Sequence, residues 1–449
     1  MKYADRQADG SEDLKKNIFE RGHAMYTTDV LRKNITDGVY DTRFEQLYPK
    51  EMKDVQKERY CRVITEFERL FGSDREAGIF SAPGRTEICG NHTDHNHGCV
   101  LAASVNLDAI AVAAKSDGTT VCVKSEGYKK DVVDLNDLEP NVSEYGRSSA
   151  LVRGVCAEFR RRGYNVGAFD AATASDVLSG SGLSSSAAFE VLLGTIINYL
   201  FNEGKVSAVE IAQIAQVAEN KFFGKPCGLL DQMTSSVGAF VRIDFADPSK
   251  PVIEKLDFDF ASCGHALCIV DTGGNHSDLT DEYAAVRKEM ESVANFLGKS
   301  VLREVEEPEF IKNIPAIRQK CGDRAVLRAM HFYADNARVD KQSAALKAND
   351  FESFKKYIIE SGRSSYMYNQ NVFTCKKTGE QPVSLALALS ETALDGCGAW
   401  RVHGGGFAGT IQAFVPNDKL AEYKDLIETV FGSGSCYVLS IRPVGGTEL

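Results

Sequence analysis

The sequence predicts an α+β fold built from two domains. Its 449 residues are too many for one ordinary hydrophobic core. Helix-like and strand-like runs alternate without the regular strand–helix–strand repeat of a parallel α/β sheet. The run DPSKP, which starts at residue 247, interrupts this pattern near the middle of the chain. We therefore expect an N-terminal extension over residues 1–55, one domain over 56–245 and a second over 246–449.

The spacing of apolar residues predicts the elements of the first half. Residues 1–55 are charged and carry little apolar periodicity, so we interpret them as a helical or loosely docked extension. KERYCRVITEFERLFG, from residue 57, has the spacing of an amphipathic helix. After a polar stretch, we expect strands at VLAASVNLDAIAVAAK and TVCVKS, helices over 149–162, 185–201 and 207–223, and a pair of strands near 237–245 and 265–271.

The second half mixes helices and strands in the same way. We expect helices near 279–297, within 324–360 and near 382–394, then a strand-like segment AWRVHGGGFAGTIQAFV, a helix over 417–431 and a final strand at YVLSIRP.

Composition excludes several classes of protein. The chain is 43% hydrophobic and 26% charged, which is typical of a globular protein. No apolar run approaches the roughly 20 residues of a membrane helix, and the N-terminus lacks the apolar core of a secretory signal. A net charge of −11 argues against nonspecific nucleic-acid binding. We expect a cytoplasmic protein, a monomer or weak homo-oligomer, with no nucleic-acid or membrane partner.

Cysteine usage and charge add two conditions. The twelve cysteines are scattered without a CxxC pair, which indicates reduced, packed thiols and no disulfide frame or zinc site. Because the chain is acidic, a polyanionic ligand needs a site made positive locally by backbone dipoles, a metal ion and a few cations.

The stretch SAPGRTEICGNHTDHNHG, residues 81–98, is the most unusual in the chain. It places one arginine, two acids and three histidines between glycines. It is too polar for a core strand and too patterned for a linker. So many polar groups in one short segment indicate a binding site.

The stretch SDVLSGSGLSSSAAFEVLLGTIINYL, residues 175–200, predicts a phosphate site. A glycine and serine turn runs directly into an apolar helix that begins near Ser184. The first turn of such a helix offers backbone N–H groups and a positive dipole end. No GK[ST] follows, so this is not a Walker A loop. A flexible connector has the same composition, but it does not usually open directly onto a long apolar helix.

Two further stretches carry candidate groups. VAENKFFGKPCGLLDQMTSSVG, from residue 217, places Glu219 late in a helix and Asp231 in a glycine-containing turn. These carboxylates suit Mg²⁺ binding and the handling of a hydroxyl proton, although each alone equally fits a surface or capping residue. RVHGGGFAGT, from residue 401, marks a close backbone approach or a structural hairpin, and we expect His403 to pack or cap locally.

Together these stretches resemble the sugar-kinase branch of the GHMP kinases, the galactokinases, over residues 57–449. SAPGRTEICGNHTDHNHG resembles the family signature GRxNLIGEHTDYNGG, and DVLSGSGLSSSAAFE resembles its phosphate loop. VHGGGFAGT resembles the third family motif, and CGLLDQ resembles the segment that bears the catalytic aspartate. The four segments occur in the family's order.

The resemblance implies a two-domain GHMP-kinase fold with ATP and sugar in the cleft between the domains. It implies transfer of the γ-phosphoryl group of MgATP to the anomeric hydroxyl of galactose, with galactose 1-phosphate as product. Phosphoryl transfer requires positioning and charge neutralisation, which an arginine, Mg²⁺ and a helix N-terminus can supply.

The resemblance also assigns roles to individual residues. Asp231 takes the position of the catalytic carboxylate and Arg85 that of the arginine beside it, which should lower the pKa of the aspartate. The expected metal pair is Ser186 and Glu219. The expected ATP-binding residues are Ser179, Gly180, Ser181, Gly182, Leu183, Ser184 and Ser185. The expected sugar contacts are Asn91, His92, Asp94, Gly228 and Tyr283.

Four polar residues of the chain depart from the family signature. Glu87 stands for Asn, Asn91 for Glu, His95 for Tyr and His97 for Gly. The family's glutamate at the position of Asn91 accepts from the C6 hydroxyl, and a neutral asparagine is expected to hold C6 more weakly. Glu87, on the same stretch, compensates only if its side chain points toward the sugar.

Three alternatives to galactose phosphorylation stay open. Loss of the negative charge at Asn91 removes a repulsion against a C6 carboxylate, so galacturonate or another C6-variant hexose is an alternative substrate. A non-catalytic sensor of galactose and ATP is a second alternative, although the retained Asp231, Arg85, Ser186 and Glu219 argue against it. A purely structural α+β protein is the third.

Overall fold

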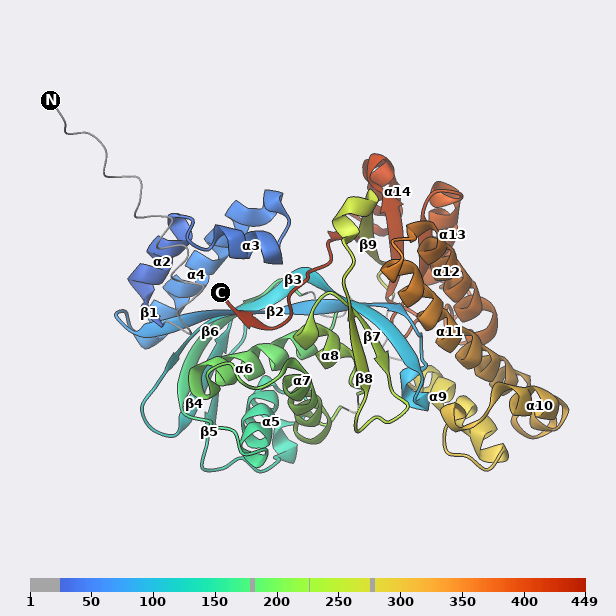
Figure 1. Ribbon diagram of the computed structural model, residues 1–449, viewed down its shortest axis with the longest axis horizontal. Helices are drawn as coiled ribbons and strands as arrows, with labels where there is room; N and C mark the ends of the chain where they lie inside the picture. The colour runs from blue at the N-terminus through green and yellow to red at the C-terminus, as the bar shows by residue number, and fades with distance from the viewer. Residues whose placement is uncertain (1–24, 178–181, 226, 275–278) are drawn as a thin grey trace.

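The structure, a computed structural model, describes residues 25–177, 182–225, 227–274 and 279–449. Within these residues the chain forms two β-sheets, each with helices packed around it (Figure 1). The predicted α+β class is confirmed. In this part of the chain, every helix is too short or too polar to cross a membrane.

The larger sheet contains nine strands, with β1, β2, β3, β6, β4 and β5 in that order. β7 extends it by pairing with both β3 and β8, and β13 returns from the C-terminus to pair with β2. Only β4 and β6 are parallel among these pairs. The strands are β1 (Tyr26–Thr27), β2 (Glu76–Cys89), β3 (Cys99–Lys115), β4 (Thr120–Ser125), β5 (Lys130–Asp134), β6 (Phe169–Ser175), β7 (Phe240–Asp244), β8 (Val252–Leu256) and β13 (Thr447–Glu448).

Helices cover both faces of this sheet, because its long strands are apolar on both sides. Ile110 and Val112 of β3 face the helices of the N-terminal segment, whereas Ala111 and Ala113 face the opposite side. The first layer contains α2 (Thr28–Thr36), α3 (Asp41–Leu47) and α4 (Lys53–Phe71); the second contains α5 (Ser148–Arg161), α6 (Ser185–Asn202), α7 (Ala208–Val217) and α8 (Leu230–Val237). Figure 1 shows the two layers above and below the sheet.

The N-terminal segment is an integral part of the larger domain from residue 25 onward. The buried Asp108 carboxylate of β3 accepts hydrogen bonds from Tyr48 (2.5 Å) and from Ser81. It also pairs with Arg59 of α4 (2.6 Å) and with Arg442 near the C-terminus (2.9 Å). Burial would raise the pKa of Asp108, but the two guanidinium groups hold it below its usual value. One ionised carboxylate thus joins both ends of the chain to the central strand.

The smaller sheet contains four antiparallel strands in the order β10, β11, β9 and β12. These are β9 (His265–Asp271), β10 (Ala399–His403), β11 (Thr410–Pro416) and β12 (Cys436–Leu439). The helices of this half are α9 (Thr280–Phe296), α10 (Glu307–Cys321), α11 (Asp323–Lys347), α12 (Phe351–Ser364), α13 (Pro382–Leu394) and α14 (Leu420–Phe431). The sequence predicted most of them but missed α10.

Two sequence predictions need correction in the middle of the chain. β7 and β9 belong to different sheets, so the predicted pairing of 237–245 with 265–271 is wrong. β7 pairs with β8, because the DPSKP run forms the hairpin turn between them. The run is therefore not a linker between domains. The domain boundary expected at 245/246 stays a prediction, while β8 and the returning β13 both belong to the larger sheet.

The polar stretch 81–98 also differs from its prediction. Its first nine residues continue β2, although the sequence was interpreted as too polar for a core strand. Thr86 and Ile88 point into the interior, while Arg85 and Glu87 lie on the opposite, partly exposed face. The strand is therefore a core strand on one side and one wall of a polar site on the other.

Candidate active site

The centre of the site is an ion pair between β2 and α8. Arg85 Nε donates to Asp231 Oδ1 at 2.7 Å, and the Ser184 hydroxyl donates to Asp231 Oδ2. A register shift in β2 between Pro83 and Arg85 marks the point where the arginine leaves the regular pleat. The structure thus brings together the predicted carboxylate and arginine, 146 residues apart in the sequence.

The environment of Asp231 keeps its side chain ionised. Burial alone would raise the pKa of Asp231, but the Arg85 guanidinium and the Ser184 hydroxyl hold it below its usual value. Its side chain remains 29% exposed, so the carboxylate stays accessible to a ligand. Asp231 lies in the first turn of α8, where the helix N-terminus further favours a negative charge.

The predicted phosphate loop lies against this pair. Ser179, Gly180 and Ser181 fall outside the described residues, so their predicted roles stay predictions. Gly182 has a left-handed backbone with φ +75°, and its carbonyl accepts from the Arg85 guanidinium. Leu183 is buried and its carbonyl accepts from the Arg85 N–H at 3.1 Å. The loop and β2 are therefore fixed to each other by hydrogen bonds.

The loop ends at the N-terminus of α6. Ser184 has φ +57°, and the helix begins at Ser185, so the chain turns sharply just before the first helical N–H groups. The Ser184 hydroxyl is directed to Asp231 and the hydroxyl of Ser186 to Glu219. The first-turn N–H groups and the positive end of the helix are what this segment offers to a phosphate.

The predicted metal pair is in contact. Ser186 Oγ donates to Glu219 Oε1 at 3.1 Å, and Glu219 lies in the π-helical turn Ala218–Phe223 that continues α7. The Lys225 ammonium lies 3.0 Å from the same carboxylate oxygen, with its side chain 62% exposed. Gln232 Nε2 donates to the other oxygen at 2.7 Å. The described residues contain no cluster of three or more histidine, cysteine, aspartate or glutamate side chains of the kind that holds a metal unaided.

Asp94 and Gly228 lie against each other near the Arg85–Asp231 ion pair. A Cβ on Gly228 would lie 2.6 Å from Asp94 Oδ2, so only glycine leaves this carboxylate its position. Burial raises the pKa of Asp94; His92 opposes the shift, while the nearby carboxylates of Glu87 and Asp231 add to it. The charges of Glu87 and Asp231 therefore influence the pKa of Asp94.

His92 and Tyr283 approach the same glycine-rich turn after β10. His92 lies 2.9 Å from the carbonyl of Gly405 through Nε2, and the Tyr283 hydroxyl donates to the carbonyl of Gly406 at 2.7 Å. A Cβ on Gly405 would meet the Tyr283 ring at 2.7 Å. Both predicted sugar contacts thus line the junction of the two domains.

His403 does not simply pack locally, as the sequence suggested, but joins the two sheets. Its Nε2 accepts from the backbone N–H of Glu87 (3.4 Å) and lies 3.1 Å from the Thr86 hydroxyl. Its Nδ1 therefore carries the proton and donates to Thr410 (2.9 Å). Burial, with the nearby Arg85, lowers the pKa of His403 to about 3, which keeps the ring neutral.

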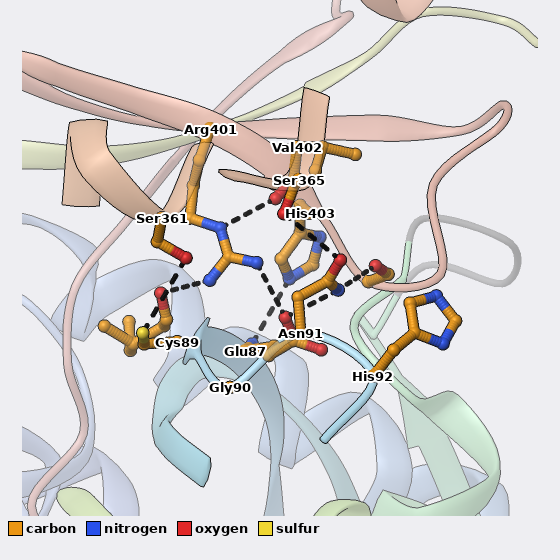
Figure 2. Close-up of polar contacts among 12 residues, drawn as sticks. Glu87, Cys89, Gly90, Asn91, His92, Ser361, Ser365, Arg401, Val402 and His403 are labelled. Atoms are coloured by element: carbon orange, nitrogen blue, oxygen red, sulfur yellow. Dashed lines mark hydrogen bonds and ion pairs between the residues drawn. The ribbon is translucent and has the colours of Figure 1, made fainter. Parts of the chain in front are cut away.

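The sequence did not identify the partners of Asn91 and Glu87. Arg401, which is fully buried on β10, donates to Glu87 Oε1 at 2.9 Å and to the carbonyl of Ile88 at 2.5 Å. Asn91 donates to the same Glu87 oxygen at 3.0 Å (Figure 2). Asn371 donates to the Asn91 side-chain oxygen at 2.7 Å. The only sequence signal for Arg401 was its place beside the three-glycine turn.

Comparison with known protein families gives matches in both parts of the site. The model of the galactokinase galactose-binding signature matches residues 65–115. The model of the GHMP kinases N terminal domain matches residues 150–239. These segments contain the polar stretch, the glycine and serine loop, Glu219 and Asp231.

Similar proteins extend the match over most of the chain. The galactokinase of Glaesserella parasuis serovar 5 (strain SH0165) is 33% identical over 373 residues, which cover 81% of this chain and 91% of the relative. The galactokinase of Streptomyces coelicolor is 30% identical over 378 residues, 83% of this chain and 92% of the relative.

Solved structures give the same result for the fold. The crystal structure of Lactococcus lactis galactokinase complexed with galactose aligns with a TM-score of 0.72 at 25% identity, covering 86% of this chain and 98% of that chain. A mevalonate kinase crystal structure aligns with a TM-score of 0.58 at 14% identity, covering 81% of this chain and 98% of that chain. The second match supports the fold alone.

Proposed function

Because this chain belongs to the galactokinase family, within the GHMP kinases, we propose that it transfers the γ-phosphoryl group of ATP to the anomeric hydroxyl of galactose, forming galactose 1-phosphate and ADP. The observation that carries this proposal is the Asp231–Arg85 pair at the N-terminal end of α6. A carboxylate for the acceptor hydroxyl and a positive region for phosphate lie side by side there.

Asp231 is the group that handles the sugar hydroxyl. Its ionised carboxylate accepts a hydrogen bond from the anomeric hydroxyl, orients the oxygen toward the γ-phosphorus and can take the proton as the new O–P bond forms. Arg85 holds this carboxylate in place and adds positive charge where charge builds up on the phosphoryl oxygens. Arg85 thereby makes this site locally positive, so that a triphosphate can bind there although the chain as a whole is acidic.

The glycine and serine loop with the first turn of α6 is the proposed ATP phosphate site. Backbone N–H groups at a helix N-terminus bind phosphate without needing a lysine from the loop. Gly182 and Leu183 are held against β2 through Arg85, so the loop reaches the phosphate already positioned. Ser185 opens the helix and presents its N–H at the same end.

Ser186 and Glu219 are the proposed Mg²⁺ ligands, because they present a hydroxyl and a carboxylate oxygen, the donors that Mg²⁺ prefers. The Lys225 ammonium beside the same Glu219 oxygen indicates a position that favours a cation. Because Lys225 is largely exposed, its side chain can withdraw when a divalent ion binds. When held by these residues, Mg²⁺ would supply positive charge that neutralises the phosphate oxygens.

The proposed sugar pocket lies between β2, the segment before α8 and the glycine turn after β10. Asp94 offers a carboxylate to sugar hydroxyls, and Gly228 leaves space beside it. His92 and Tyr283 close the pocket from the side of the second domain. The chain retains the residues expected to bind both the sugar and MgATP. We therefore favour a catalytic function over a sensor function.

The test is a phosphorylation assay with MgATP on a panel of sugars, with the position of the product phosphate assigned by NMR. We expect galactose 1-phosphate as the main product. Absence of turnover with galactose, or a kcat/KM for galacturonate about tenfold or more higher, would refute the assignment. An Asp231→Ala variant that keeps most of its activity would instead support a site in which this carboxylate has no catalytic role.

A further inference from the structure

Glu87 and Asn91 together reproduce the family signature with two residues exchanged. GRxNLIGEHTDYNGG has asparagine at the position of Glu87 and glutamate at the position of Asn91. In the folded chain these two side chains contact each other, because Asn91 Nδ2 donates to Glu87 Oε1 at 3.0 Å (Figure 2). The chain thus keeps one acid and one amide in contact. The acid is residue 87 in this chain, whereas the family signature has it at the position of residue 91.

The Asn91 side chain has no hydrogen-bonding capacity left for a ligand. Its amide nitrogen donates to Glu87 and to the carbonyl of Gly404 at 2.7 Å. Its oxygen accepts from Asn371 at 2.7 Å and from Ser365 at 3.4 Å. The side chain is also fully buried. Although the sequence predicted it as a sugar contact, Asn91 is bonded to protein groups on every side.

The Glu87 carboxylate, in contrast to the Asn91 side chain, keeps one oxygen that can accept from a ligand. It lies on the same face of β2 as Arg85, which points to the catalytic centre, and its side chain is 12% exposed. Its side-chain hydrogen bonds within the described part of the chain all use Oε1, which accepts from Arg401 and Asn91. Its charge also acts on Asp94, so it lies on the sugar side of the strand.

Arg401 fixes this carboxylate from the second domain. Its guanidinium is fully buried and donates to Glu87, to the carbonyl of Ile88 and to the carbonyl of Val402 at 3.0 Å. The guanidinium donates to Glu87 through a charge-assisted hydrogen bond from the other sheet. One oxygen is held in place, and the other is left to accept from a ligand.

We propose that Glu87 binds a sugar hydroxyl as the acidic acceptor that the family signature places at the neighbouring position, with Asn91 and Arg401 as its positioning residues. This inference rests on the proposed function and narrows its substrate class. Together with Asp94 and Asp231, Glu87 surrounds the pocket with three carboxylates. Such a pocket selects a neutral hexose and disfavours galacturonate through like-charge repulsion.

The first test is Glu87→Gln, whose amide oxygen can still accept from Arg401 and Asn91. We expect the KM for galactose to rise about 10- to 100-fold, because a hydrogen bond to a charged acceptor is replaced by one to a neutral group. We expect kcat to stay within about threefold, because the group does not touch the reacting atoms. The preference for galactose over galacturonate should narrow by a similar factor.

Monodeoxygalactoses identify the hydroxyl that Glu87 binds. The analogue that lacks this hydroxyl should have the same KM in the wild type and in Glu87→Gln, while the other analogues show the full increase. An unchanged KM for galactose in Glu87→Gln, or a loss confined to kcat, would overturn the proposal. If the wild type phosphorylates galactose, either result refutes the role of Glu87 and leaves the proposed function intact.

The second test restores the order of the family signature. Glu87→Asn alone leaves Arg401 without its carboxylate, and Asn91→Glu alone places two carboxylates in contact, so either variant should lose thermal stability and raise the KM for galactose. The double variant Glu87→Asn/Asn91→Glu keeps one acid and one amide. We expect its KM and Tm to lie closer to the wild type than those of either single variant. A double variant no better than the worse single variant, including one that does not fold, would overturn the exchange.

Discussion

Arg85→Met should change the pH dependence of phosphoryl transfer in a defined direction. In the wild type, burial would raise the pKa of Asp231, but Arg85 at 2.7 Å and Ser184 lower it below its usual value. Methionine keeps the bulk of the side chain but removes the positive charge. An opposite charge at this distance favours the ionised carboxyl, so its loss should raise the pKa of Asp231.

The sign of the activity change follows from the protonation state. In the proposed mechanism Asp231 accepts the hydroxyl proton only when it is ionised, so kcat/KM falls as pH falls through its pKa. In the wild type this decline lies below the usual range of an aspartate, and in Arg85→Met it should move to higher pH. Normalising each profile to its own plateau removes the overall loss of rate caused by the missing guanidinium.

The assay is kcat/KM for galactose from pH 4 upward, with saturating MgATP and with Tm recorded at each pH. Arg85→Lys is the matched control: it keeps a positive charge, so its decline should shift less than that of the methionine variant. Profiles of the wild type and Arg85→Met that coincide after normalisation would refute the claim that this ion pair keeps the catalytic carboxylate ionised.

Three other substitutions test the metal pair, the sugar pocket and the N-terminal segment. Lys225→Met should lower the Mg²⁺ concentration for half-maximal activity, because the ammonium 3.0 Å from Glu219 competes with a divalent ion; an unchanged Mg²⁺ titration contradicts this. Gly228→Ala should raise the sugar KM about tenfold at unchanged Tm, because its methyl group would crowd a carboxylate of the pocket, and a normal KM argues against that pocket. Tyr48→Phe should lower the free energy of unfolding in urea by about 1.5–3 kcal/mol through loss of its bond to ionised Asp108, whereas a loss under about 0.5 kcal/mol refutes an integral N-terminal segment.

Local patterns predicted the start of α6 and two residues that the structure brings together. The run of glycine and serine before an apolar helix placed the start of α6 at Ser184, and the structure begins the helix at Ser185. The family motifs supplied Arg85 and Asp231, which the structure joins at 2.7 Å. The helix start depends on residues within one motif, and the contact follows from a resemblance that already encodes which motifs meet. The catalytic and phosphate-binding roles stay predictions.

The predictions failed where a distant segment decides the outcome. The polar stretch is predicted to lie outside the core, but β3 pairs with β2 along it, and His403 and Gln412 of the smaller sheet contact the buried Thr86. The sequence predicts a strand pair from β7 and β9, because consecutive strands often pair. In the structure the DPSKP turn brings β8 beside β7 instead. The partner of Glu87 lies 314 residues away in the other domain, where no local pattern reaches it.

The same long-range contacts explain why so many polar groups occur within residues 81–98. The N–H groups of Gly90 and Asn91 donate to Asp335 of α11 at 3.1 and 3.0 Å, and the Asn91 carbonyl lies 2.8 Å from His331. These groups are buried, and each would cost about 1–3 kcal/mol if it lost its partner while it stayed in this dry interface.

The polar stretch therefore contacts the second domain on one side and faces the proposed substrate site on the other. On one side its backbone and the Glu87–Arg401 pair hold the second domain against β2. On the other, Arg85, Glu87 and Asp94 face the proposed substrates. Because the same short segment contacts both, the relative position of the domains sets the geometry of the sugar pocket. A substitution that loosens Arg401 should consequently affect sugar affinity before it affects the described end of the predicted phosphate loop, where Gly182 and Leu183 are bonded to Arg85 of β2.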